Sequence, residues 1–257
     1  MPVMRLTTVG TGTAAPSASR VQAGHLVEAG PAHVLLDCGS GVHHRLAQLG
    51  IDWMRITHLA LSHFDADHVS DLPTLLVAWR YGALPPRTAS LGLFGPAGAQ
   101  SLLDRLTELL GVRYASYGYP VTVRELASEE AAELPGGTRL RARTVPHTAA
   151  SVAYSIERAG RRVVYTGDTG FDVALGEWAA GCDVLLCECS LPAAMAIPSH
   201  LTPEQCGALA ALARPRLLAL THFYPPVERV DIRTIVAEQF DGPVVLATDG
   251  WSTDIEE

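Results

Sequence analysis

The chain has 257 residues, of which 48% are hydrophobic and 18% charged, the balance of an ordinary globular protein. All 19 basic residues are arginine, which excludes Schiff-base chemistry on a lysine and a phosphate-binding loop with its lysine. The net charge of −8 argues against a protein that grips nucleic acid through many phosphate contacts, because such contacts need a basic face.

The first residues, MPVMRLTTVG, predict a strand and not a signal peptide, because no charged segment precedes an apolar one. No apolar run approaches the length of a membrane span. Five scattered cysteines, an odd number, are typical of buried, reduced thiols: Cys38, Cys182, Cys187, Cys189 and Cys206. We therefore expect a cytoplasmic protein without a membrane partner.

Short apolar runs bounded by turn residues predict strands at residues 4–10, 24–30, 33–39, 58–63, 91–95, 152–158, 162–168, 183–189, 216–222 and 243–250. Helical spacing predicts helices at residues 41–49, 72–80, 96–110, 172–180, 203–213 and 229–239. Thr202 is the expected N-cap of the fifth helix, and residues 81–90 and 126–137 look least regular. Strands and helices recur in two halves around residue 115. This order predicts one α/β domain over residues 1–257, with two sheets face to face and helices outside.

The stretch LSHFDADHVSDL, residues 61–72, places four potential metal ligands within six positions after a predicted strand. Alternate residues of an extended segment point the same way, so His63 and Asp65 can converge on one ion. Asp67 and His68 follow at the turn into the next helix and can face a second ion. One loop cannot complete two coordination spheres, and three later strand ends offer further ligands: His147, Asp168 and His222.

Six motifs along almost the whole chain resemble the metallo-β-lactamase superfamily: TVGTGTAAPS, LLDCGSG, SHFDADHVSDL, HTAASVAY, YTGDTG and LTHFYP. The resemblance implies a four-layer αββα sandwich with two divalent ions at its edge, zinc by first expectation and manganese or iron as alternatives. It assigns His63, position 65 and His147 to the first ion, Asp67, His68 and His222 to the second, and Asp168 to both.

Position 65 departs from the family pattern, because Asp65 stands where the family has the second histidine of the loop. A carboxylate is a legitimate zinc ligand, but it is shorter than imidazole and makes the first site harder, which favours manganese or iron more than usual. The alternative is that Asp65 does not bind metal and that the first site is weak or empty.

Glu188 in LLCECS and His200 in PSHLTPE resemble the ribonuclease Z and cyclic phosphodiesterase branch of the superfamily. That resemblance implies that the histidine, held by the glutamate, handles the proton of the leaving group. A purely structural pair is the alternative. Together with Asp67, these two residues are the predicted catalytic group.

The family's ribonuclease Z members carry a long tRNA-binding arm between the motifs of His147 and Asp168, where this chain has only enough residues for a hairpin. With the acidic charge, this predicts a small phosphodiester substrate such as a cyclic nucleotide, cleaved by a metal-bound hydroxide. A lactone or thioester hydrolase, an RNA-processing enzyme and an inactive metal-binding regulatory module are the alternatives. A homodimer is compatible with the sequence.

Several residues near the motifs receive less specific interpretations. Asp37 is expected to shape a turn beneath the site, and Gly10 and Gly12 lack the third glycine of a dinucleotide-binding fingerprint. Some histidines fit no ligand motif: His25, His33, His43, His44 and His58. Some aromatic residues either stack on a base or simply pack: Phe64, Trp79, Tyr81, Phe223 and Tyr224.

Overall fold

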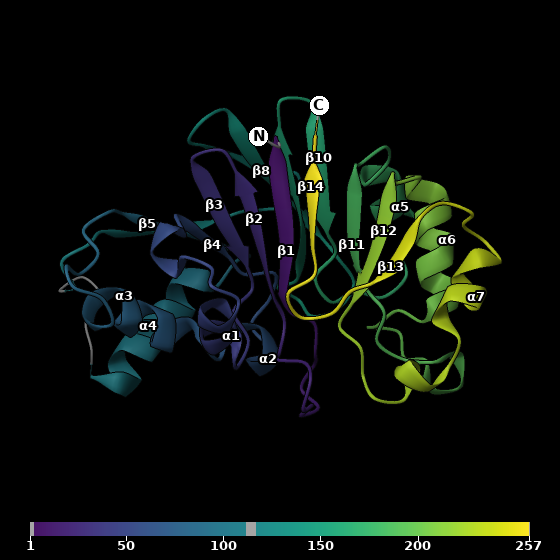
Figure 1. Cartoon of the computed structure of the whole chain (residues 1–257), viewed down its shortest axis with the longest axis horizontal. Coiled ribbons are helices and arrows are strands. Elements are labelled where there is room, and N and C mark those ends of the chain that lie inside the picture. Colours follow the sequence, from purple (N-terminus) through teal and green to yellow (C-terminus); the bar gives the residue numbers. More distant parts are fainter. Residues whose placement is uncertain (1–2, 112–116, 257) are drawn as a thin grey trace.

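The computed structural model describes residues 3–111 and 117–256. Two seven-stranded sheets face each other in this part of the chain, and helices cover their outer sides (Figure 1). The predicted four-layer αββα sandwich is confirmed.

The first sheet has the strand order β14-β1-β2-β3-β4-β5-β6. Its strands are β14 (Ser252–Ile255), β1 (Met4–Gly10), β2 (Gly24–Ala29), β3 (Ala32–Leu36), β4 (His58–Ala60), β5 (Leu91–Gly95) and β6 (Val121–Glu125). The helices of this half are α1 (Val42–Gln48), η1 (Trp53–Arg55), α2 (Ala66–Val69), α3 (Leu72–Tyr81) and α4 (Ala99–Leu110).

The second sheet has the order β13-β12-β11-β10-β9-β8-β7. Its strands are β13 (Val244–Leu246), β12 (Leu217–Thr221), β11 (Val184–Glu188), β10 (Arg161–Tyr165), β9 (Val152–Arg158), β8 (Thr138–Thr144) and β7 (Ala131–Leu134). The helices are α5 (Val173–Trp178), η3 (Ala193–Met195), α6 (Pro203–Ala213), η4 (Val227–Arg229) and α7 (Ile232–Ala237).

The predicted elements differ from the observed ones in a few places. The change of sheet occurs between β6 and β7, not around residue 115, which lies outside the described residues, and β14 returns to the first sheet beside β1. The segment 126–137, expected to be irregular, contains β7. Residues 229–239 form a shorter helix than predicted, because Val230 is extended and Asp231 caps α7 by accepting a hydrogen bond from Thr234 N. Thr202 caps α6 as predicted, with Gln205 completing a capping box.

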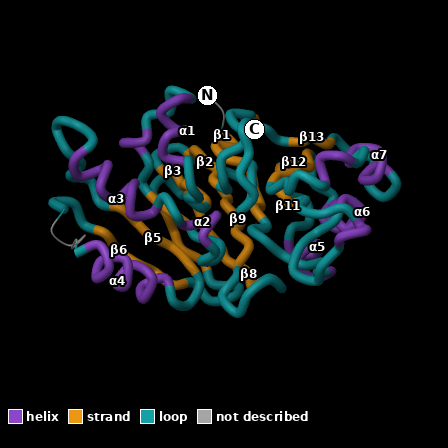
Figure 2. The backbone as a smooth tube through the Cα atoms, turned by 90° about the horizontal axis from the view of Figure 1, so that it is seen from below, coloured by secondary structure: helices purple, strands orange, loops and turns teal. Residues whose placement is uncertain are grey.

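Parallel strands bring the site's loops to one edge of the molecule. In the first sheet β3, β4 and β5 run parallel, and in the second β10, β11 and β12 do, so the loops that follow each set gather at one end. The two ends meet, because Val152 N donates to Ser62 O at 2.9 Å and Tyr154 Oη to Leu61 O at 2.9 Å. In Figure 2 the strands lie between helices on both outer sides, and α2 lies among their ends.

Three apolar layers hold these strands in place. One fills the space between the sheets and includes Leu6, Val34, Tyr154 and Leu186, all buried. The others lie between each sheet and its helices. Strands such as β11 are buried on both faces, which explains why they read as continuous apolar runs. Among the described residues no helix is long and apolar enough to cross a membrane.

Candidate metal centre

The metal-binding loop leaves β4 and passes over the turn that follows β3. Cys38 N donates to His68 O at 2.7 Å, and a Cβ on Gly39 would lie 1.9 Å from Asp67 O. Only glycine fits at position 39, so the LLDCGSG turn can lie directly beneath the loop. Asp37, buried in this turn, adopts φ 58°, a left-handed conformation that is uncommon for a residue with a side chain.

The seven predicted ligands lie together at this edge. The Nε2–Oδ distances are 3.6 Å for His63–Asp65, 3.2 Å for His147–Asp65, 3.3 Å for His68–Asp168, 3.4 Å for His222–Asp67, 3.5 Å for His222–Asp168 and 3.8 Å for His63–Asp168. His63, Asp65 and His147 form one group whose ligand atoms lie close together, and Asp67, His68 and His222 form another. Asp168 contacts members of both groups.

In the first sheet's half, two histidines are oriented by one buried carboxylate. The Ser62 hydroxyl donates to Asp37 Oδ2 at 2.7 Å, so it receives the proton of His63 Nδ1 at 2.9 Å. His68 Nδ1 lies 2.8 Å from the same Asp37 oxygen and donates to it. Tyr165 Oη also donates to Asp37 at 2.8 Å. With Nδ1 carrying the proton, each ring turns the lone pair of Nε2 toward the site.

The second half repeats this arrangement with a different carboxylate. The Ser190 hydroxyl donates to Glu188 Oε2 and receives the proton of His222 Nδ1 at 3.0 Å. His147 Nδ1 donates to Ser199 O at 3.0 Å. All four imidazoles therefore present Nε2 to the site, which is how metal-binding histidines are usually oriented.

The polar atoms inside the site fit a cation. His63 Nε2 and Asp168 Oδ1 are buried and have no hydrogen-bond partner in the described part of the chain. The Nε2 atoms of His68 and His222 lie 3.3 Å apart, although both rings hold their Nδ1 protons in other hydrogen bonds. Two lone pairs at this distance need a proton or a cation near them. Imidazole and carboxylate donors together suit zinc and similar divalent ions.

Asp65 is placed like a ligand and not like a helix cap. It occupies the N-cap position of α2, yet its side chain accepts no hydrogen bond from the helix. The carboxylate instead lies beside His63 and His147, although 53% of the side chain is exposed. The neighbouring imidazoles of His63 and His147 hold the pKa of Asp65 well below its usual range, despite some burial.

Charges of opposite sign balance inside the site when no ion is bound. Burial favours the neutral form of both Asp168 and His68. The positive charges of His222 and His68 nevertheless hold the pKa of Asp168 well below normal, and Asp168 and Asp37 raise the pKa of His68 well above normal. An ion that binds through these groups must therefore displace protons, so metal affinity falls as the pH falls.

Glu188 and His200 form the predicted pair. His200 Nδ1 lies 3.1 Å from Glu188 Oε1 and 3.2 Å from Oε2, and the carboxylate also accepts from Thr169 N at 2.6 Å. Burial would lower the pKa of His200, but its hydrogen bond to Glu188 and the charges of nearby carboxylates raise it to about 9. The ring stacks on His222, with centroids 5.9 Å apart, and Nε2 makes no hydrogen bond within the described residues.

A family described as "Beta-lactamase superfamily domain" matches residues 32–223, about three quarters of the chain. The chain belongs to the beta-lactamase superfamily. The protein ML1173 of Mycobacterium leprae (strain TN) is 33% identical over 268 residues, which cover 98% of this chain and 89% of the relative. A protein named Ribonuclease Z from Mycobacterium avium (strain 104) is 30% identical over 271 residues, 96% of each chain.

A solved structure shares the fold. The metallo-beta-lactamase fold protein YhfI from Bacillus subtilis matches with a TM-score of 0.84 at 22% identity, covering 99% of this chain and 100% of that one. Within the superfamily, the chain lies in the branch that includes ribonuclease Z. Its family and its clusters of histidine and aspartate make it a metal-dependent hydrolase that binds divalent metal.

The aromatic candidates divide by burial. Trp79 is fully buried and donates to Trp53 O, which makes it a core residue and not a pocket wall, and Tyr81 is 69% exposed. Phe223 is buried beneath the guanidinium of Arg20, 4.8 Å from its ring centre. Tyr224 packs edge-on against the rings of His200 and His222.

The remaining motifs have structural explanations. A Cβ on Gly10 would lie 1.9 Å from Gln22 O, so this glycine permits close contact between backbones and is no part of a dinucleotide loop. The unassigned histidines join no group of potential ligands in the described residues. His25 is fully buried, and neither ring nitrogen has a hydrogen-bond partner there. All five cysteines are free and buried, as predicted.

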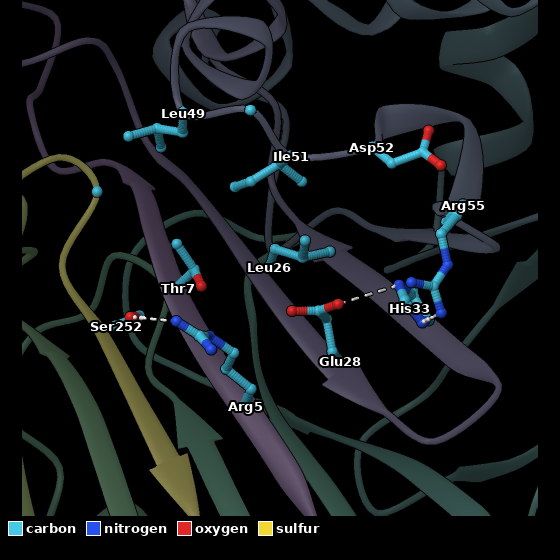
Figure 3. A pocket seen from close by; sticks show the side chains of 12 residues that line it. Arg5, Thr7, Leu26, Glu28, His33, Leu49, Ile51, Asp52, Arg55 and Ser252 are labelled. Carbon is cyan, nitrogen blue, oxygen red and sulfur yellow. Dashed lines mark hydrogen bonds and ion pairs between the residues drawn. The ribbon is translucent and has the colours of Figure 1, made fainter. Parts of the chain in front are cut away.

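A cavity of about 380 Å³ lies away from the metal centre, on the outer face of the first sheet (Figure 3). Arg5 and Glu28 line the cavity on the side of the strands, and His33 lies beside Arg55, 3.3 Å away, at the end near Asp52. Arg5 donates to Ser252 Oγ at 2.9 Å and His33 lies 3.6 Å from Glu28, so these charged groups already have partners within the protein.

Sequence reasoning missed Ser62, Ser190 and Tyr165, and assigned Asp37 only to a turn. Ser62 directly precedes the predicted ligand His63, and Ser190 follows Glu188 by two positions. No sequence pattern of metal sites marks a serine at either place. Asp37 offered a better signal, because an aspartate directly after the apolar run HVLL must find partners when it is buried.

Proposed function

We propose that the chain is a dinuclear metal phosphodiesterase whose substrate is a small phosphodiester such as a cyclic nucleotide, and that residues 1–257 act as one domain. The observation that carries this proposal is the Glu188–His200 pair, which lies against both groups of ligands. His200 Nδ1 lies 3.9 Å from Asp168 Oδ2, and its ring centre lies 4.9 Å from that of His147. Such a pair has a use where an alkoxide must be protonated as it leaves.

The first ion would be held by His63, Asp65 and His147 and the second by Asp67, His68 and His222, and Asp168 lies near members of both groups. Zinc suits these donors, and the carboxylate at position 65 makes manganese and iron suitable as well. When bound, the ions supply Lewis acidity toward the phosphoryl group and lower the pKa of the attacking water.

Two side chains of the protein carry out the proton transfers. His200 donates a proton from Nε2 to the departing oxygen, and Glu188 fixes the ring through Nδ1. Asp67, which is buried with Oδ2 3.4 Å from His222 Nε2, would help to hold the second ion. Its Oδ1 makes no hydrogen bond in the described part of the chain and would be free to accept the proton of the attacking water.

Two features support a small, singly charged substrate. β9 and β10 are joined by a tight turn at Ala159 and Gly160, both in the left-handed conformation typical of two-residue hairpins, so no arm is inserted there. The described ion-pair partners of Asp65, Asp67, Asp168 and Glu188 are all histidines, and no arginine of the described residues pairs with these carboxylates, which favours a singly charged diester over a phosphate monoester.

RNA processing is the second candidate, because the relative from Mycobacterium avium with matching length is named Ribonuclease Z. The missing arm and the net charge of −8 favour the small substrate.

The test measures bound metal and turnover together, after separate loading with zinc, manganese and iron. The substrates are bis(p-nitrophenyl) phosphate, a 3′,5′-cyclic nucleotide, a lactone and a tRNA precursor. We expect turnover of both phosphodiesters, its loss in His222→Ala, and wild-type rates in His44→Ala, a matched change at an exposed histidine outside the site. Preferential cleavage of the tRNA precursor would favour RNA processing. Turnover of the lactone alone, or of nothing at full metal content, would overturn the phosphodiesterase assignment.

A further inference from the structure

We propose that Tyr224 is a further catalytic residue, whose hydroxyl donates a hydrogen bond to a non-bridging oxygen of the substrate's phosphoryl group. This assignment rests on the proposed phosphodiesterase function. Tyr224 follows His222 by two positions in the loop after β12, and no spacing rule in the sequence gives it this role.

The ring of Tyr224 lies between the two functional parts of the site. Its centre is 6.2 Å from that of His200, at an interplanar angle of 72°, and 5.8 Å from that of His222, at 84°. In the proposed function His200 serves the leaving group and His222 the second ion, so a phosphoryl group that reaches both lies beside this ring. The side chain is half-buried, which leaves one side open to a ligand.

The hydroxyl of Tyr224 makes no hydrogen bond within residues 3–111 and 117–256, so its proton is available to a ligand. A phenol is a neutral O–H donor at physiological pH.

The backbone holds this donor firmly in place. Tyr224 N donates to Ser190 O at 3.3 Å, which ties it to the loop that anchors His222. Two prolines follow, and Val227 N donates to Tyr224 O at 3.1 Å. His222 itself has φ 59°, a strained left-handed conformation that turns the chain sharply before Tyr224. A donor fixed in this way loses little conformational entropy when a ligand binds.

The substrate needs such a donor, because the site offers few others. A phosphodiester has two non-bridging oxygens, and His200 is engaged with the leaving oxygen. The chain has no lysine. Arg20, which packs over the adjacent Phe223, already donates to Glu228, Thr11 and Ala247.

The experiment compares Tyr224→Phe with wild type as the metal-loaded protein, and Tyr81→Phe, at an exposed tyrosine on α3, is the matched control. We expect kcat/KM of Tyr224→Phe to fall by about 10- to 100-fold, the value of a hydrogen bond to a charged group. The fall is the same for bis(p-nitrophenyl) phosphate and a 3′,5′-cyclic nucleotide, because a non-bridging oxygen is present in both. The inhibition constant of dimethyl phosphate, which is not cleaved, rises as well, and the metal content is unchanged.

Other outcomes overturn the assignment. Wild-type kcat/KM in Tyr224→Phe, or the same loss in Tyr81→Phe, would show that the hydroxyl does not touch the substrate. A loss confined to the cyclic nucleotide would place the hydroxyl on the leaving oxygen, and a loss of metal would make its role structural. If wild type cleaves no phosphodiester, the proposed function itself fails, whereas active wild type with an equally active variant refutes the role of Tyr224 alone.

Discussion

Replacing Asp65 with alanine tests whether the departure from the family pattern is a working ligand. The substitution leaves the first ion with His63, His147 and the shared Asp168. Four-ligand zinc sites bind with roughly 10–16 kcal/mol, so one ligand of four contributes about 3 kcal/mol if the energy is shared evenly, more than a hundredfold in affinity. We therefore expect Asp65→Ala to lose about one metal per chain on dialysis, while the second ion keeps Asp67, His68 and His222.

The loss of metal in Asp65→Ala should not result from a loss of fold stability. The Asp65 side chain is 53% exposed and caps no helix, and its contacts with His63 and His147 are partly open to solvent, so alanine should change the metal-free unfolding free energy by no more than about 1 kcal/mol. Asp65→His should keep both ions and shift the preference toward zinc. The assay is metal counting by mass spectrometry on dialysed variants. Two metals per chain and wild-type activity in Asp65→Ala would show that Asp65 is a bystander.

Three further substitutions test the rest of the site and the core beneath it. His200→Ala should lower cyclic-nucleotide turnover by ~10²–10⁴-fold and turnover of p-nitrophenyl esters far less, because a general acid matters most for a basic leaving oxygen; equal losses would make His200 a positioning residue. Ser62→Ala should weaken metal binding by about 10- to 100-fold, as loss of a hydrogen bond to a ligating histidine does, and unchanged affinity by competition with a chelator would exclude the relay to Asp37. Burial lowers the pKa of His25 to about 3, whereas in the unfolded chain this histidine keeps its ordinary pKa of about 6.5. As the pH falls below about 6.5 the unfolded chain takes up this proton and the folded chain does not, which lowers the free energy of unfolding by about 2 kcal/mol at pH 5. Denaturant unfolding of metal-free His25→Leu should therefore show a flatter pH profile than wild type between pH 7 and 5, and parallel profiles would refute this reasoning.

The sequence predicted best where a strand is buried on both faces. Runs such as DVLLCEC and RLLALTH are apolar throughout, and their carboxyl ends carry the residues that meet at the sheet edge. Edge and surface strands were missed for the opposite reason. β6 and β8 alternate arginine or threonine with apolar residues, VTVRE and TRLRART, so they contain no continuous apolar run. β14 is short and polar, and only its pairing with β1, far away along the chain, makes it a strand.

The residues of the metal centre also differ in how well the sequence predicts them. The positions of His63, Asp67, His68 and Asp168 follow from strand ends, which the sequence marks. The serine relays depend on which side chain lies behind each imidazole, and that is set by which strands are neighbours in a sheet: β3 and β4 for Asp37, Ser62 and His63, and β11 and β12 for Glu188, Ser190 and His222. The cytoplasmic location and a homodimer stay predictions.

One carboxylate, Glu188, is common to two histidines with different tasks. It holds His200 directly and His222 through Ser190. Removing it therefore releases the proton donor and a metal ligand in a single step, so the energetic effects of substitutions at these positions should not add. In a thermodynamic cycle, Glu188→Gln combined with His200→Ala should cost much less than the sum of the separate losses.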